Sequence, residues 1–182
     1  MADTVVPLTP ADQVLVTAWV EAMTLLKRTQ KCRGQLSWAD QAVYERAGKL
    51  GEVAFSHVFG YPVDWHIHAG GDKGIDFTLS NGETVDVKAV KVAANMRFDY
   101  NIPLERDKPP ATYYVQVLIA PAWDYAVITG GISRVRFLRE GVVQKGWTHR
   151  GTIEPLVIQR RRLSQAYPAA FWAHPLVGVV EP

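Results

Sequence analysis

The sequence predicts an α/β fold from two observations: helical periodicity in the first third of the chain, and extended runs separated by turn residues in most of the rest. Apolar residues recur at intervals of three and four along 11–30. They predict an amphipathic helix with an apolar stripe made of Val14, Leu15, Ala18, Trp19, Met23 and Leu26. A second helix is expected to start at Ser37 or Asp40, either of which can cap it, and to end at Phe59 before Gly60-Tyr61-Pro62.

The extended runs follow the second helix. We expect strands at 63–68, around Asp76, from Asp86 through Lys91, and at 112–119, 125–129 and 155–159. Residues 92–110 are expected to form a long irregular loop, which in a compact domain is often functional. Ser133 can cap a short helix through Leu138, although an extended stretch also fits there. A further short helix is expected at 166–172.

Length and composition favour one globular domain. The chain has 182 residues, of which 48% are hydrophobic and 21% are charged, as expected for a protein with a real core. We expect a single domain over 1–182, with its core at about 37–160, the N-terminal helix at 11–30 and a C-terminal tail at 163–182. Apolar runs long enough to cross a bilayer and the features of a signal peptide are missing from the sequence. A cytoplasmic location is therefore expected, and a single cysteine, Cys32, excludes an intrachain disulfide.

Charge is unevenly distributed along the chain. Residues 1–87 contain seven Lys and Arg against eleven Asp and Glu, whereas residues 134–162 contain eight basic residues against two acidic ones. This asymmetry suits a protein that binds a metal ion with one part and a polyanion with another, although a solvated basic surface would also produce it.

The candidate site is centred on a hairpin that includes Asp76, Asp86 and Lys88. Asp86 and Lys88 are two residues apart on one expected strand, so their side chains share a face. The position of Asp76 depends on the turn. A two-residue Asn81-Gly82 loop would put Asp76 and Asp86 on opposite faces. A three-residue loop, with Gly82 in the left-handed conformation, would pair Asp76 with Asp86. We favour the three-residue loop because it keeps the apolar residues of both strands on the buried side.

Glu52 is a third acidic residue of the candidate site, and it lies within the apolar stretch of the second helix. Carboxylate oxygens are hard ligands, so Glu52, Asp76 and Asp86 beside Lys88 favour Mg²⁺, with Mn²⁺ able to substitute. The alternative is a structural salt-bridge cluster, but three acids and one lysine leave excess negative charge. His66 and His68 also share a strand face, but a zinc site lacks a third matching ligand.

In this arrangement the sequence resembles the PD-(D/E)xK nuclease superfamily. The resemblance rests on Gly51-Glu52, Gly74-Ile75-Asp76 and Asp86-Val87-Lys88, and it covers roughly residues 45–140. It implies a restriction-endonuclease-like fold, a mixed β-sheet flanked by helices. It also implies that Asp76, Asp86, Glu52 and the Val87 carbonyl hold the metal ion and that Lys88 is the catalytic lysine. Two departures are Ile75 in the place of the proline and Asp86 where glutamate is commoner.

The resulting expectation is a Mg²⁺-dependent nuclease that hydrolyses DNA phosphodiester bonds, of a phage, defence or DNA-processing type, and able to act as a homodimer. Residues expected to contact the DNA backbone are Lys73, Lys91, Arg97, Arg160, Arg161 and Arg162. Two alternatives stay open: a catalytically inactive nucleic-acid-binding protein of the same fold, and an RNA-acting nuclease.

Overall fold

The computed structural model describes residues 3–29, 37–67, 74–93, 101–104, 110–143, 148–149, 152–153, 156–159, 163, 167 and 169–172. Its longer elements are β1 (Thr4–Pro7), α1 (Pro10–Thr29), α2 (Trp38–Phe59), β3 (Thr84–Lys91), β5 (Tyr113–Ile119), β6 (Tyr125–Ser133) and α3 (Arg134–Glu140). The shorter ones are β2 (Phe77–Thr78), β4 (Asn101–Leu104), β7 (Val142–Val143), β8 (Thr148–His149), β9 (Thr152–Ile153), β10 (Leu156–Gln159) and the 3-10 helix η2 (Ala169–Trp172).

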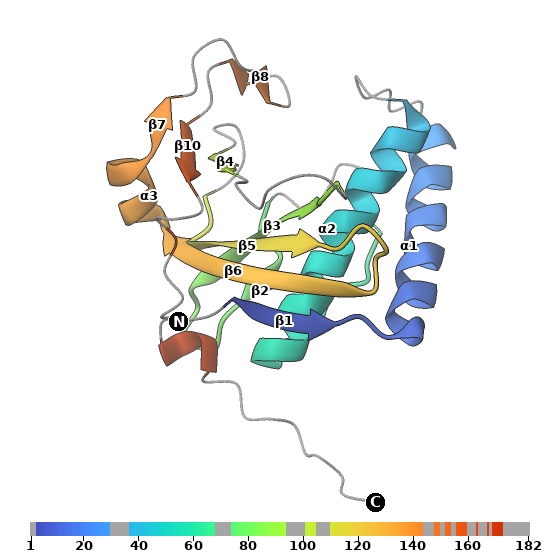
Figure 1. Cartoon of the computed structure of the whole chain (residues 1–182), viewed down its shortest axis with the longest axis horizontal. Helices are drawn as coiled ribbons and strands as arrows, with labels where there is room; N and C mark the ends of the chain where they lie inside the picture. Colours follow the sequence, from blue (N-terminus) through green and yellow to red (C-terminus); the bar gives the residue numbers. More distant parts are fainter. Residues whose placement is uncertain are drawn as a thin grey trace, which may run out of the picture.

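A mixed five-stranded sheet with strand order β1-β6-β5-β3-β2 forms the centre of the molecule (Figure 1). The neighbours β3 and β5 run parallel, whereas the other pairs are antiparallel. Strands β4, β10 and β7 form a second, smaller sheet. The predicted α/β class is therefore confirmed, with helices and a mixed sheet in one chain.

Both long helices begin and end close to their expected limits. The Ser37 side chain accepts a hydrogen bond from the Asp40 N–H at the start of α2, and Gly60 ends the helix in the left-handed conformation. The stripe predicted for α1 was partly wrong. Val16, Val20 and Met23 are the buried positions, while Val14 and Leu15 are 68% and 55% exposed. The periodicity was correct, but apolar residues on two sides of α1 made its buried face ambiguous.

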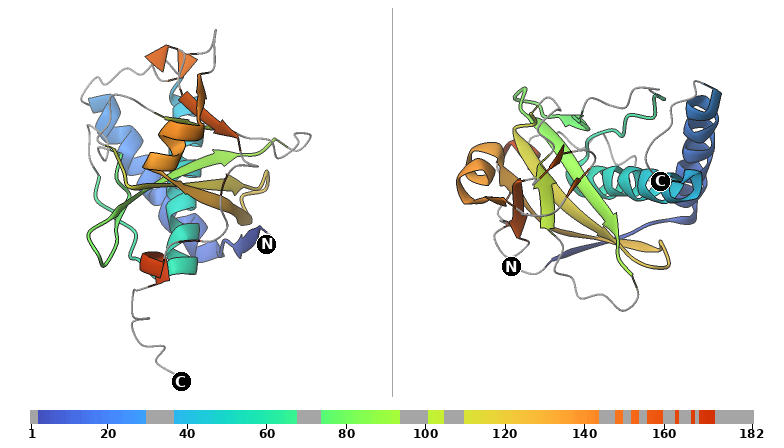
Figure 2. Two further views of the ribbon diagram at one scale, coloured as in Figure 1. Left: turned by 90° about the vertical axis from the view of Figure 1, so that its left-hand side faces the viewer. Right: turned by 90° about the horizontal axis from the view of Figure 1, so that it is seen from above.

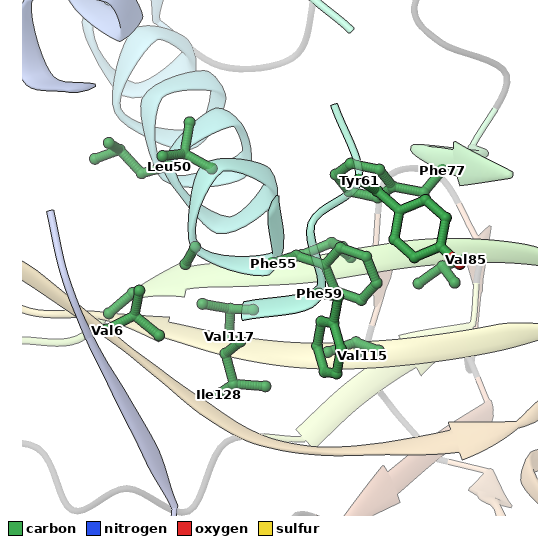
Figure 3. Close-up of a cluster of buried hydrophobic side chains, with 14 of the residues drawn as sticks. Val6, Leu50, Phe55, Phe59, Tyr61, Phe77, Val85, Val115, Val117 and Ile128 are labelled. Carbon is green, nitrogen blue, oxygen red and sulfur yellow. The ribbon is translucent and has the colours of Figure 1, made fainter. Parts of the chain in front are cut away.

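Helix α2 packs across one face of the five-stranded sheet and forms the larger core with it. Phe55 on α2 stacks against Phe77 on β2 with ring centroids 4.6 Å apart, and both lie in one cluster with Val85, Val115 and Val117 from the sheet (Figure 3). Helix α1 packs against α2, and its Val16 and Val20 complete the same cluster. The side chains of this face that pack in the cluster beneath α2 are therefore apolar.

The opposite face of the sheet has a different cover. Tyr114 of β5 and Ile132 of β6 pack there with Phe137 of α3 and with Ile102 and Ile158 of the smaller sheet. Viewed from above, α3 and the α1–α2 pair lie on opposite sides of the sheet (Figure 2, right). Because side chains alternate along a strand, β3 directs Val85 and Val87 toward α2 and presents Asp86 and Lys88 to the other side.

Several expected elements differ from the observed ones. Residues 63–67 follow α2 without forming a strand, so the strand expected at 63–68 was wrong over its described part. The stretch expected to be an irregular loop contains β4, and β6 extends to Ser133 rather than ending at Thr129. The last expected helix is the single 3-10 turn η2, whose Phe171 is buried in the larger core. Among the helices that the structure describes, we found none with the length and apolar character of a membrane span.

Gly51 gives a direct test of the contact between α2 and β3. A Cβ atom added to Gly51 would lie 2.4 Å from the Ala89 Cβ, whereas one added to Gly48 meets nothing within 4 Å. We expect Gly51→Ala to lower the free energy of unfolding by about 1–3 kcal/mol through overpacking. Gly48→Ala, the control in the same helix, should raise it by about 0.5–1 kcal/mol. Urea unfolding measures both, and equal stability of the two variants would contradict the close packing.

Candidate functional site

The hairpin turn has the three-residue loop favoured by the sequence. Phe77 pairs with Val85 and Thr78 with Thr84, and the Leu79 N–H donates to the Glu83 carbonyl over 2.7 Å. Gly82 has φ +83°, and its N–H donates to the Leu79 carbonyl, which closes the turn. The register that relates β2 to β3 was therefore predicted correctly from the turn residues.

Asp76 lies where the β2–β3 ladder ends. Strand β2 begins one residue later, at Phe77, and the Asp76 N–H donates to the Val85 carbonyl over 2.9 Å. Oδ2 of Asp76 accepts a 2.6 Å hydrogen bond from the Val87 N–H, so the carboxylate continues the ladder in place of backbone. Because the N–H and C=O groups of a strand residue point to the same side, the Val87 carbonyl also faces the edge at Asp76.

Asp86 and Lys88 form an ion pair on the adjoining face of β3. The Lys88 Nζ lies 2.7 Å from Asp86 Oδ2, and the two side chains are 17% and 10% exposed. The Asp76 carboxylate reaches the backbone of the residue between them. Asp86 and Lys88 therefore lie on the face of β3 away from α2, and Asp76 lies at the edge of the strand, bound to the residue between them.

Glu52 occupies a different environment, inside α2. It is 8% exposed, and its Oε2 lies 2.6 Å from the Lys49 Nζ one turn earlier. Lys49 also donates to the Asp64 carbonyl over 2.9 Å and lies 4.4 Å from the ring centroid of Trp19. Glu52 is thus buried, as its apolar sequence context suggested, but its described partner is a lysine that sequence reasoning missed. A Lys and Glu three residues apart in an apolar helix segment were the available signal.

Tyr114 is a further polar group on the Asp86 face of the sheet. It is the register partner of Asp86 on β5. Burial raises the pKa of the Tyr114 phenol and the Asp86 carboxylate adds to that rise, whereas Arg134, which also hydrogen-bonds to the phenol, and Lys88 oppose it. Tyr114 and Arg134 were not among the predicted site residues. Tyr114 was missed because the parallel pairing that brings it beside Asp86 joins two strands that are far apart in the sequence.

Of the residues expected to contact nucleic acid, Lys91 alone belongs to the described part of the chain, and Lys73, Arg97, Arg160, Arg161 and Arg162 lie outside it. The Lys91 Nζ lies 4.3 Å from the ring centroid of Trp123, which Arg46 of α2 also contacts. Lys91 therefore leaves β3 on the face opposite Lys88. His66 is on the surface, with its Nδ1 2.6 Å from the Asp64 carboxylate, and His68 is outside the described residues.

In the described residues, no group of three or more His, Cys, Asp and Glu side chains is assembled to hold a metal ion. Asp86 and Glu52 are instead each bound to a lysine. The donor set at the sheet edge nevertheless consists of hard oxygens: the Asp76 and Asp86 carboxylates and the Val87 carbonyl. That chemistry fits a small divalent cation such as Mg²⁺.

Comparisons with known proteins identify no family for this chain. No family model, curated protein or solved structure matches the chain. The geometry of the site and its physical chemistry therefore have to support any functional conclusion.

The Lys49–Glu52 pair can be tested as a unit. Lys49→Met should lower the free energy of unfolding by about 3–5 kcal/mol, because it leaves the Glu52 carboxylate buried without its ammonium. Replacing both residues, as Lys49→Met with Glu52→Met, should restore most of the loss. Arg136→Met breaks an exposed pair with Glu140 and should cost less than about 1 kcal/mol. Chemical denaturation measures all three, and full stability of the Lys49→Met variant would show that Glu52 does not depend on this lysine.

Proposed function

We propose that this chain is a Mg²⁺-dependent nuclease of the PD-(D/E)xK type, which hydrolyses phosphodiester bonds of DNA by attack of water. The observation that supports the proposal most is the largely buried Asp86–Lys88 ion pair next to the Asp76 carboxylate. These residues are the ones that carry the sequence resemblance. A mixed sheet with helices on its two faces is also compatible with a restriction-endonuclease-like fold.

Asp76, Asp86 and the Val87 carbonyl are the groups that would hold the ion. When bound, Mg²⁺ supplies positive charge against the phosphate oxygens and lowers the pKa of a coordinated water. Asp86 Oδ2 is bound to Lys88 in this structure, and the remaining lone pairs of the carboxylate are the ones that would hold an ion. The resemblance also assigns Glu52 to this set, whereas the structure places Glu52 in α2, on the opposite side of the sheet from Asp86 and Lys88, and pairs it with Lys49.

Lys88 has two tasks in the proposed reaction. Its ammonium, 2.7 Å from Asp86, donates hydrogen bonds that orient the attacking water. It also stabilises the negative charge that grows on the phosphate oxygens as the new P–O bond forms and the bond to the leaving oxygen breaks. Only 17% of the Lys88 side chain is exposed. Because the side chain is already held in place, it loses little conformational freedom when it contacts the substrate.

DNA is the proposed partner because of the basic character of the 134–162 segment. Its described helix α3 begins with Arg134, which hydrogen-bonds to Tyr114 on the Asp86 face. Arg136 and Arg139 on the same helix pair with Glu140 and remain partly or largely exposed. Contacts of such arginines with the phosphate backbone would make affinity fall with salt concentration. Action as a homodimer, in the cytoplasm, is part of the same proposal.

The proposal predicts that Asp86→Asn and Lys88→Met each reduce Mg²⁺-dependent DNA cleavage by at least about 100-fold, because charge stabilisation and proton transfer contribute that much or more. Asp124→Asn, the same kind of change in an exposed turn, should leave cleavage unchanged. Plasmid, single-stranded and branched DNA, with Mg²⁺ or Mn²⁺, are the substrates, and gel shift of the same DNA measures binding.

Other outcomes identify the alternatives. Wild-type protein that binds these DNAs and cleaves none of them would be a nucleic-acid-binding protein rather than a nuclease. Cleavage of RNA alone, offered in the same buffer, would identify an RNA-acting enzyme. Full activity of the Asp86→Asn and Lys88→Met variants would refute the assignment of the site.

A further inference from the structure

Strand β6 contains a bulge opposite Gln116 of β5, the residue that pairs with Lys88 on β3. Gln116 pairs with Gly130 and the next residue, Val117, pairs with Ile128, so Thr129 is an extra residue on β6. Gly130 has φ +141°, a conformation that favours glycine. Bulges often occur next to active sites, where they change the direction of a side chain. Here the redirected side chain is that of Thr129.

Thr129 makes its hydrogen bond inside the protein. Its Oγ1 lies 2.7 Å from Gln116 Oε1, and the two residues are 3% and 1% exposed. The register opposite Gln116 is occupied by a glycine, so the threonine hydroxyl can approach the amide without a competing side chain. A buried glutamine is unusual in the apolar strand Tyr113–Ile119, because its amide has to be hydrogen-bonded to offset desolvation.

The orientation of the Gln116 amide follows from this bond. Its oxygen accepts from Thr129 on β6, on one side of β5, and β3 lies on the other side of β5. The β3 residue in register with Gln116 is Lys88, whose ammonium is itself a donor. Among the described residues of this face, the Tyr114 phenol and the Asp86 carboxylate are oxygen acceptors, and Asp86, bound to Lys88 at 2.7 Å, is the charged one.

We infer that Gln116 is a positioning residue of the candidate site: anchored by Thr129, its amide NH₂ donates to Asp86 and fixes the rotation of that carboxylate. This inference deepens the proposed function and rests on it for its catalytic meaning. Asp86 then has Lys88 and Gln116 as fixed donors, and its remaining lone pairs keep a constant direction for a metal ion. Groups that orient a metal ligand typically alter metal affinity by about 10–100-fold when they are removed.

The contact itself is tested in the metal-free full-length chain by NMR. The side-chain NH₂ resonances of Gln116, assigned by their loss in Gln116→Met, should shift in Asp86→Asn and in Thr129→Val. They should stay in place in Asp124→Asn, an exposed carboxylate outside the site. Resonances that do not respond to Asp86→Asn would overturn the inference, whatever the protein's activity.

The functional consequence is tested by calorimetric titration with Mn²⁺ alone. Gln116→Met and Thr129→Val should each weaken Mn²⁺ binding by about 10-fold or more, and Thr129→Ser, which keeps the hydroxyl, should restore it. Leu118→Met, a buried apolar neighbour on the same face of β5, is the control for general repacking and should bind Mn²⁺ like the wild type. Equal weakening by Leu118→Met would assign the effect to packing and overturn the positioning role.

Cleavage kinetics separate this inference from the proposed function. For an active nuclease, Thr129→Val should lower kcat while KM for DNA stays unchanged, because substrate contacts are untouched. If the wild type neither binds Mn²⁺ nor cleaves DNA but the Gln116 NH₂ responds to Asp86→Asn, the nuclease proposal fails and the Gln116–Asp86 contact stands as a structural one. If the wild type cleaves DNA and Thr129→Val has normal kcat and Mn²⁺ affinity, the nuclease stands and the positioning role fails.

Discussion

The close approach of α2 to β3 is the constraint on which the rest of the structure depends. A helix can come this near to a sheet only where a residue without a side chain faces it, and Gly51 meets Val87 and Ala89 in this way. Val87 packs against the helix. Because side chains alternate along a strand, those of its two neighbours, Asp86 and Lys88, point to the other side of the sheet. The apolar contact thus decides where the charged residues of β3 go.

The charged residues of the candidate site form ion pairs between near neighbours in the sequence, on either side of that apolar layer. Lys88 and Asp86 are two residues apart on one strand, and Lys49 and Glu52 are three apart on one helix. Removing such pairs from water is costly, and apolar replacements are often at least as stable. Stability alone therefore explains their presence poorly, and for Asp86 and Lys88 the proposed reaction would give a reason for it. Asp76 is the link between the sheet edge and the pair on β3, through the Val87 N–H.

The sequence allowed much of the fold to be predicted, and local signals account for what succeeded. Ser37 and Gly60 marked the ends of α2, Ser133 capped α3, and Gly82 fixed the hairpin register. What failed depended on contacts between distant segments. The buried side of α1 is chosen by the packing of α2, and an extended reading of 63–67 was wrong because no neighbouring strand pairs with it among the described residues.

The site shows the same division. The spacing of Asp86 and Lys88 sufficed to place them on one face. The roles of Lys49 and Tyr114 could not be seen in the same way, because the first depends on Asp64 and Trp19 from other segments and the second on the β3–β5 register. The Thr129 bulge was hidden for a similar reason: two adjacent glycines follow it, and their sequence resembles an ordinary strand end.

The N-terminal strand β1 has a consequence for how the edge of the sheet behaves when this strand detaches. Thr4–Pro7 pairs with Tyr125–Ile128 and covers the outer border of β6, with Val6 buried beneath it. Proline at the end of β1 and only four residues of pairing make this cover short. If it peels away, the hydrogen-bonding groups of β6 become a template for any other extended chain, including the β1 of a second molecule. Exchange of this strand between two copies would pair the same edge of β6 with the same four residues of β1.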